Sequence, residues 1–97
     1  MSNNINLQIE QLIDSHNWLL KEGRLCKQFQ FKNFESVMNF VNELSTKIIE
    51  SDHHPIMTIN FNSLGIELFS FDENQITKKD TVMASYIDTK FKNLSYE

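Results

Sequence analysis

The chain contains very little glycine, proline or cysteine. Its 97 residues include two Gly, one Pro and one Cys. Because these residues usually mark turns, the ends of helices and strands have to be found from polar clusters and from changes in the spacing of apolar residues. The single Cys26 cannot form a disulfide within the chain, and the first thirty residues lack the apolar segment of a signal peptide. We therefore expect a cytoplasmic protein.

Two further absences limit the partners that we expect. The chain has 9 Lys and Arg against 13 Asp and Glu, which gives a net charge of −4. A nucleic-acid-binding protein usually carries a basic excess clustered on one face, so nucleic acid is not expected as a partner. No apolar run approaches the length of about 20 residues that a membrane helix needs. A membrane is therefore not expected as a partner either.

The apolar content is sufficient for one small core. Hydrophobic residues make up 40% of the chain, and eight of the residues are Phe. This length predicts a single domain over residues 1–97. A domain of this size buries only roughly 60 to 65% of the surface of its unfolded chain, so self-association would add stability. We expect a homo-oligomer.

Three segments have apolar residues every three or four positions, which is the spacing of one helical face. The predicted helices cover residues 5–17, 34–51 and 77–94. Asn33 is expected to cap the second of them, because an Asn side chain can accept a hydrogen bond from the first turn of a helix. The second helix has the widest apolar face and is predicted to be the main core helix.

Between these helices, large apolar residues alternate with polar ones, which is typical of half-buried strands. Residues 18–21 and 25–31 are predicted to form one hairpin. A third strand is predicted to run to Phe61 and a fourth from Leu64 to Phe71, with a turn at 62–63. The order is α-β-β-α-β-β-α. It favours an α+β fold in which an antiparallel four-stranded sheet packs against helices.

The segment Asp52-His53-His54-Pro55 is the first candidate for chemistry, and it lies between a predicted helix and a predicted strand. Free imidazole groups titrate near about pH 6.5, so adjacent histidines can serve as general acid and base. A solvated polar pair is the alternative. No metal site is predicted, because neither a third His nor a Cys lies at the spacing of metal ligands.

The sequence also resembles a known family in several places. The stretch from Lys27 to Phe34, the helix predicted after it, the segment 52–55, Phe61-Asn62 and Asp80 resemble the pterin-4a-carbinolamine dehydratase family. The resemblance runs without gaps over about residues 18–87. It implies the α-β-β-α-β-β-α fold, a homodimer or homotetramer, and no metal or organic cofactor. The implied activity is a lyase reaction in tetrahydrobiopterin recycling, the dehydration of 4a-hydroxytetrahydropterins to quinonoid dihydropterins.

The resemblance also implies roles for individual residues. His53 would be the catalytic acid and base, His54 would hold the pterin, and Asp80 would orient a catalytic imidazole. The implied substrate-binding residues are Asp52, His53, His54, Ser70 and Phe71. Asp80 lies three residues after Thr77, which resembles a capping box, so helix capping explains this carboxylate about as well.

The sequence departs from the family pattern at three positions. Phe71 stands where the family has a third active-site histidine, and Phe cannot donate, accept or carry a proton. By this comparison, the imidazole that Asp80 should orient is missing. A positioned acid or base is typically worth about 10² to 10⁴ in rate, so we expect weak activity or none. Ile49 replaces a common acidic residue, and Met57 replaces the usual Trp.

Three hypotheses about function remain open from the sequence. The first is a dehydratase of reduced activity that works through His53. The second is a catalytically silent member of the family that binds a pterin or a protein, with Phe71 stacking on the flat ring. The third is a structural or assembly protein that uses only its exposed sheet and its oligomer surface.

Overall fold

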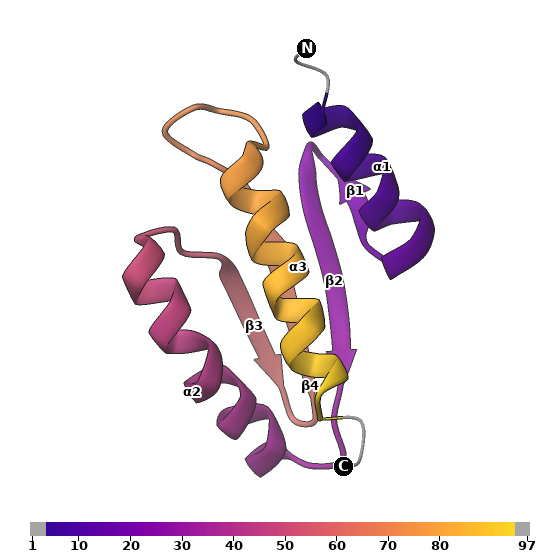
Figure 1. Ribbon diagram of the computed structural model, residues 1–97. Helices are drawn as coiled ribbons and strands as arrows, with labels where there is room; N and C mark the ends of the chain where they lie inside the picture. The colour runs from indigo at the N-terminus through magenta and orange to yellow at the C-terminus, as the bar shows by residue number, and fades with distance from the viewer. Residues whose placement is uncertain (1–3, 95–97) are drawn as a thin grey trace.

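The structure is a computed structural model that describes residues 4–94. Three helices and four strands follow one another in the order α-β-β-α-β-β-α, which confirms the predicted fold class (Figure 1). The elements are α1 (Asn4–His16), β1 (Leu19–Lys21), β2 (Arg24–Gln30), α2 (Phe34–Ser51), β3 (Ile56–Asn60), β4 (Ser63–Leu68) and α3 (Lys78–Lys92). No helix among the described residues is long and apolar enough to cross a membrane.

The four strands form one antiparallel sheet in the order β1-β2-β4-β3. The helices lie together on one face of this sheet (Figure 1). In the central strand β4, Leu64, Ile66 and Leu68 are buried at alternating positions, because successive side chains point to opposite faces of a strand. The helices bury this apolar face, and the other face carries Gly65 and Glu67.

The core fills the space between the sheet and the helices. Its largest fully buried side chains are Trp18, Phe29 and Phe40. The ring of Phe91 on α3 lies 4.9 Å from that of Phe29 on β2, in an edge-to-face arrangement that aromatic pairs favour. This packing holds α3 against the sheet and thereby places the first turn of α3 at one end of the molecule.

The first two strands each differ by one residue from the predicted ranges 18–21 and 25–31. The predicted ends of the third and fourth strands are also wrong, and both of these errors have a local cause. The third strand ends at Asn60, because Phe61 adopts a left-handed conformation with φ 55° and starts the turn to Ser63. The fourth strand ends at Leu68. Ser70 pairs instead with Gln75 in an isolated bridge, so Phe71 lies in the turn between these two residues and not on a strand.

Both predicted helix caps are confirmed. Oδ1 of Asn33 accepts a hydrogen bond from the backbone of Ser36 at the start of α2. Thr77 and Asp80 form a capping box at the start of α3. At the other end of α2, Asp52 takes a left-handed conformation with φ 54° and ψ 37°, which ends the helix and turns the chain toward β3.

Candidate active site

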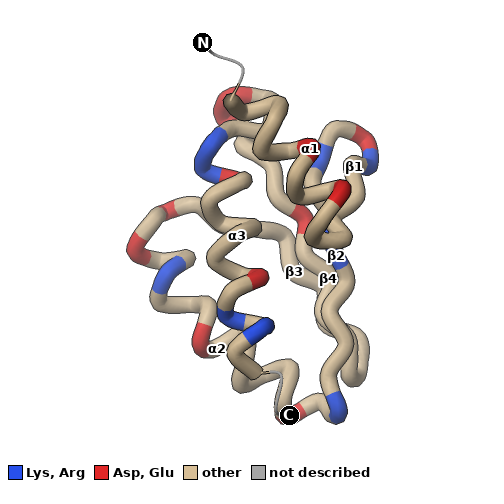
Figure 2. The backbone as a smooth tube through the Cα atoms, turned by 45° about the vertical axis from the view of Figure 1, so that its right-hand side comes forward, with Lys and Arg blue, Asp and Glu red and all other residues tan. Residues whose placement is uncertain are grey.

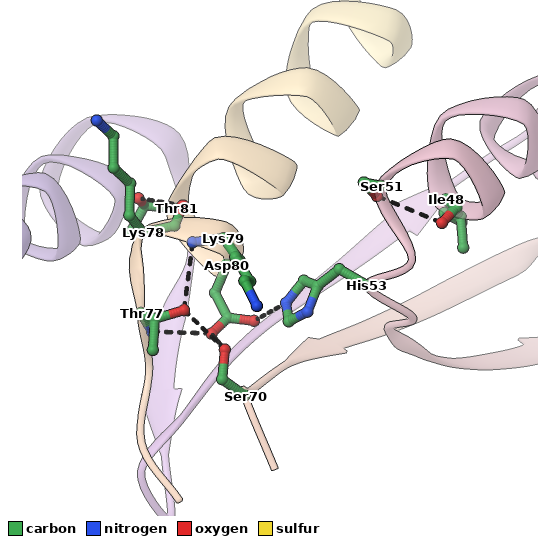
Figure 3. Close-up of polar contacts among 9 residues, drawn as sticks. All are labelled: Ile48, Ser51, His53, Ser70, Thr77, Lys78, Lys79, Asp80 and Thr81. Atoms are coloured by element: carbon green, nitrogen blue, oxygen red, sulfur yellow. Dashed lines mark hydrogen bonds and ion pairs between the residues drawn. The ribbon is translucent and has the colours of Figure 1, made fainter. Parts of the chain in front are cut away.

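The site is centred on a contact between two side chains from different elements. Nε2 of His53, just after α2, lies 2.6 Å from Oδ1 of Asp80 in the first turn of α3 (Figure 3). The Asp80 side chain is 0% exposed and that of His53 is 12% exposed. The sequence placed His53 among the catalytic candidates, and the structure gives it a buried carboxylate as partner.

The second oxygen of Asp80 anchors the carboxylate to the protein. Oδ2 accepts hydrogen bonds from the backbone N–H of Thr77 at 2.9 Å and from the hydroxyl of Ser70 at 2.8 Å. A hydroxyl has one hydrogen to donate, so the 2.7 Å contact between Ser70 and Thr77 is a bond donated by the Thr77 hydroxyl. One oxygen of Asp80 therefore caps α3, and the other binds the imidazole.

This arrangement assigns the roles of the two ring nitrogens of His53. Asp80 can only accept, so Nε2 carries the hydrogen and donates it to the carboxylate. The Nδ1 atom has no hydrogen bond to any residue in 4–94, and no buried side-chain nitrogen in that range lacks a partner. In the neutral ring, Nδ1 therefore presents a free lone pair to solvent or to a ligand.

A cavity lies beside this imidazole. It measures about 310 Å³, near the lower end of the range for small-molecule sites, which is roughly 300 to 1,000 Å³. Its lining residues are Lys47, Ser51, His53, Lys78, Lys79, Val82 and Met83. A single bicyclic heterocycle fits a volume of this order, and His53 is the one lining residue that can act as both acid and base near neutral pH.

The other predicted site residues divide into two groups. Ser70 is buried and joins His53 and Asp80 through the carboxylate. The side chains of Asp52 and His54 are 92% and 64% exposed, with 3.8 Å between a carboxylate oxygen of Asp52 and Nε2 of His54. These two residues therefore lie at the surface next to the site.

Phe71 also lies at the surface, with 56% of its side chain exposed. Its ring centroid lies 5.1 Å from that of Phe69 and 5.1 Å from the guanidinium carbon of Arg24. The expectation that Asp80 has lost its imidazole partner is wrong, because His53 fills that role.

Two features of the site were not predicted. The first is the Thr77 hydroxyl, which supports Ser70; the capping-box spacing identified the residue but not this bond. The second is the set of three lysines in the cavity lining, Lys47, Lys78 and Lys79. Lys78 and Lys79 are neighbours in the sequence, so this basic pair could have been noticed there. Lys47 lies on another helix, and nothing in the sequence indicated that it lines the same cavity. Within residues 4–94, no group of three or more His, Cys, Asp or Glu side chains could hold a metal ion.

Similar proteins include both sequence relatives and solved structures. Two relatives carry the name "Putative pterin-4-alpha-carbinolamine dehydratase". The protein of Picosynechococcus sp. is 32% identical over 78 residues, which cover 80% of this chain and 85% of the relative. The protein of Metallosphaera sedula is 30% identical over 82 residues, which cover 84% of this chain and 85% of the relative.

Two solved structures share the fold. A transcriptional coactivator/pterin dehydratase from Brucella melitensis superposes with a TM-score of 0.79 at 23% identity, covering 93% of this chain and 95% of that one. A pterin dehydratase-like protein described as a RuBisCO assembly factor in the alpha-carboxysome gives a TM-score of 0.63 at 19% identity, covering 76% of this chain and 86% of that one.

The family comparison agrees with the resemblance in the sequence and extends over nearly the whole chain. A model of the family described as Pterin 4 alpha carbinolamine dehydratase matches residues 4–90. This match includes the three residues of the buried network, His53, Ser70 and Asp80. The chain belongs to the pterin 4 alpha carbinolamine dehydratase family.

Proposed function

We propose that the protein dehydrates a 4a-hydroxytetrahydropterin to the quinonoid dihydropterin, with His53 as the acid and base. The observation that carries this proposal is the bond between Nε2 of His53 and the buried carboxylate of Asp80, beside a cavity of about 310 Å³. The bond fixes both the ring orientation and the tautomer, which are the two requirements for proton transfer at a defined atom.

The reaction needs one proton to leave the substrate and one to arrive. The bond between C4a and its hydroxyl oxygen breaks, a carbon–nitrogen double bond forms, and the ring nitrogen loses its proton. Nδ1 of His53 would take that proton, and the resulting imidazolium would be stabilised by Asp80 at 2.6 Å. The same nitrogen would then protonate the departing hydroxyl, so water leaves and His53 returns to its neutral form.

We expect the exposed residues Asp52 and His54, on either side of His53 in the sequence, to contribute to binding, although neither lines the cavity. His54 and Asp52 would contact the pterin from the rim, since their polar side chains are free to turn toward a ligand. Phe71 offers an aromatic face but no proton. Because Phe71 replaces the third histidine of the family pattern, we propose a turnover rate below that of family members that have this histidine.

We also propose that the protein works in the cytoplasm as a homodimer or homotetramer, without a metal or organic cofactor. Exposed apolar side chains lie on both edge strands of the sheet, Leu19 and Leu20 on β1 and Ile56 and Ile59 on β3. An edge strand has unpaired backbone groups, so these strands are suited to association with a second copy.

The experiment generates the 4a-carbinolamine with an aromatic amino-acid hydroxylase and follows its dehydration. Wild-type protein should accelerate the reaction, and His53→Ala should lower the rate by about 10² to 10⁴. The matched control is His16→Ala, because His16 is an exposed histidine at the end of α1 and lies outside the site. If wild type and His53→Ala both react at the uncatalysed rate, the protein is not a dehydratase.

Binding without turnover is a second candidate function. Phe71 favours it, because an exposed aromatic ring at this position can stack on a pterin but cannot transfer a proton. In that case a reduced pterin analogue would bind with a measurable Kd, the affinity would fall in His54→Ala, and no dehydration would be observed. Binding by calorimetry together with the rate assay distinguishes the two functions.

A further inference from the structure

The cavity beside His53 has a charge opposite to that of the whole chain. The chain has a net charge of −4, yet three of its nine basic residues line this cavity, and no lining residue is acidic. The carboxylate next to it, Asp80, is buried and accepts three hydrogen bonds from other groups. The cavity therefore has an excess of positive charge that the described part of the protein leaves unneutralised.

None of the three lysines forms an ion pair with any residue in 4–94. Nζ of Lys47 lies 5.4 Å from the ring centroid of Tyr86, which fixes this side chain over α3 without neutralising it. In Figure 3 the side chain of Lys79 runs beside the His53–Asp80 pair, whereas that of Lys78 extends away from it. Lys79 is thus the lysine best placed to contact a ligand that also contacts His53.

Helix stability does not explain why Lys78 and Lys79 lie at this position. Both lie in the first turn of α3, and Figure 2 shows basic residues at the start of this helix. The N-terminus of a helix carries a partial positive charge, so cations there are unfavourable. A bound anion would reverse this effect, because it would interact favourably with both ammonium groups and with the end of the helix.

We propose that the ligand of this cavity carries a phosphate group, held by Lys79 and Lys47 while its ring faces His53. This inference rests on the proposed function for the pterin ring and adds the phosphate on its side chain. Lysine ammonium groups bind phosphate as point charges, and a phosphate monoester has close to two negative charges at neutral pH. Val82 and Met83 supply the apolar part of the lining for the ring.

The test compares two probes by calorimetry: neopterin, whose side chain ends in a hydroxyl, and its phosphate monoester. In 50 mM salt the phosphate ester should bind about tenfold more tightly, as expected for two or three exposed charge pairs. The difference should shrink in 0.5 M salt because of screening. The difference in affinity should be lost in Lys79→Ala, decrease in Lys47→Ala and decrease least in Lys78→Ala. It should persist in the control Lys92→Ala, at the far end of α3.

The outcomes separate this inference from the proposed function. Equal affinities for the two probes in wild type would overturn the phosphate site and leave pterin binding intact. If neither pterin binds, inorganic phosphate is titrated while the NMR signals of His53 and Lys79 are followed. Shifts of the His53 signal that disappear in Lys79→Ala would then support the phosphate site and overturn the pterin function. The absence of such shifts would overturn both.

Discussion

One carboxylate oxygen of Asp80 lies 2.6 Å from Nε2 of His53, although 27 positions separate the two residues. The other oxygen of Asp80 caps α3 through Thr77. A single side chain therefore starts a helix and orients an imidazole from the far end of another helix. Since the backbone at Asp52 turns the chain out of α2, the ends of α2 and α3 together determine where the ring of His53 lies.

Asp80→Asn should abolish most of the activity while preserving the fold. The side-chain amide has nearly the shape of the carboxylate, and its oxygen can still accept from Thr77 and Ser70. Its NH₂ group would then face Nε2 of His53 as a donor, so the ring would have to carry its hydrogen on Nδ1. We expect the dehydration rate to fall by about 10² to 10⁴, and nitrogen NMR should report the change of tautomer.

The control for this substitution is Asp72→Asn, at an exposed position in the turn after Ser70. It should leave the rate and the tautomer of His53 unchanged. Urea unfolding of Asp80→Asn should show a loss of about 1 to 2 kcal/mol in the free energy of unfolding, the cost of weakening a cap and its charged hydrogen bonds. Wild-type activity in Asp80→Asn would show that the tautomer of His53 has no role in the reaction.

The sequence predicted what depends on local pattern. The bounds of α2, the cap at Asn33 and the capping box at Thr77 follow from residues within one or two turns of each other, and the structure has all three. The partner of Asp80 depends on contacts across 27 positions. The family pattern placed the imidazole partner of Asp80 at position 71. A comparison of sequences does not show which of two imidazoles a carboxylate contacts.

The end of β4 and the charge of the cavity were missed for related reasons. Alternation of apolar residues continues to Phe71, but the strand stops at Leu68, where its pairing with β2 and β3 ends. A net charge of −4 describes the whole chain and conceals a local excess of lysine. That excess arises only when Lys47 on α2 and the first turn of α3 line the same cavity.

Asp88→Ala should destabilise the fold far more than the loss of an exposed carboxylate such as Asp14. Oδ2 of Asp88 accepts from the fully buried Trp18 indole at 2.9 Å, and Oδ1 pairs with Nζ of Lys27 at 2.7 Å. Alanine would leave both donors without this acceptor, which costs about 2 to 4 kcal/mol in the free energy of unfolding. Urea denaturation measures the loss, and Asp14→Ala on the exposed surface of α1 should change it by less than about 0.5 kcal/mol.

Cys26 should react slowly with iodoacetamide at pH 8. Burial raises the pKa of the Cys26 thiol, and the negative charge of Glu67 raises this pKa further. Only the thiolate reacts, so the rate at pH 8 should be several-fold lower than that of free cysteine and should continue to rise above pH 9. Glu67→Gln removes the charge and releases Arg24 from its 3.0 Å ion pair, and both changes favour the thiolate.

The pH profile of alkylation in Glu67→Gln should therefore shift to lower pH. Glu73→Gln is the matched control, because Glu73 lies in the exposed turn after Ser70 and does not contribute to the pKa of Cys26. Mass spectrometry of the alkylated fraction over time gives the rates. A profile that is identical in wild type and in Glu67→Gln would show that Glu67 does not affect the thiol.

Phe71→His should raise the dehydration rate by at least about tenfold, because it restores the third histidine of the family pattern. Position 71 follows Ser70, whose hydroxyl binds Asp80, and the present ring lies against Phe69 and Arg24. The Phe71 side chain is 56% exposed, and its replacement should change the free energy of unfolding by less than about 1 kcal/mol. Phe61→His, in the exposed turn between β3 and β4, is the control and should leave the rate unchanged. The rate is measured with enzymatically generated 4a-carbinolamine, and an equal rate for Phe71→His and wild type would show that Phe71 does not limit turnover.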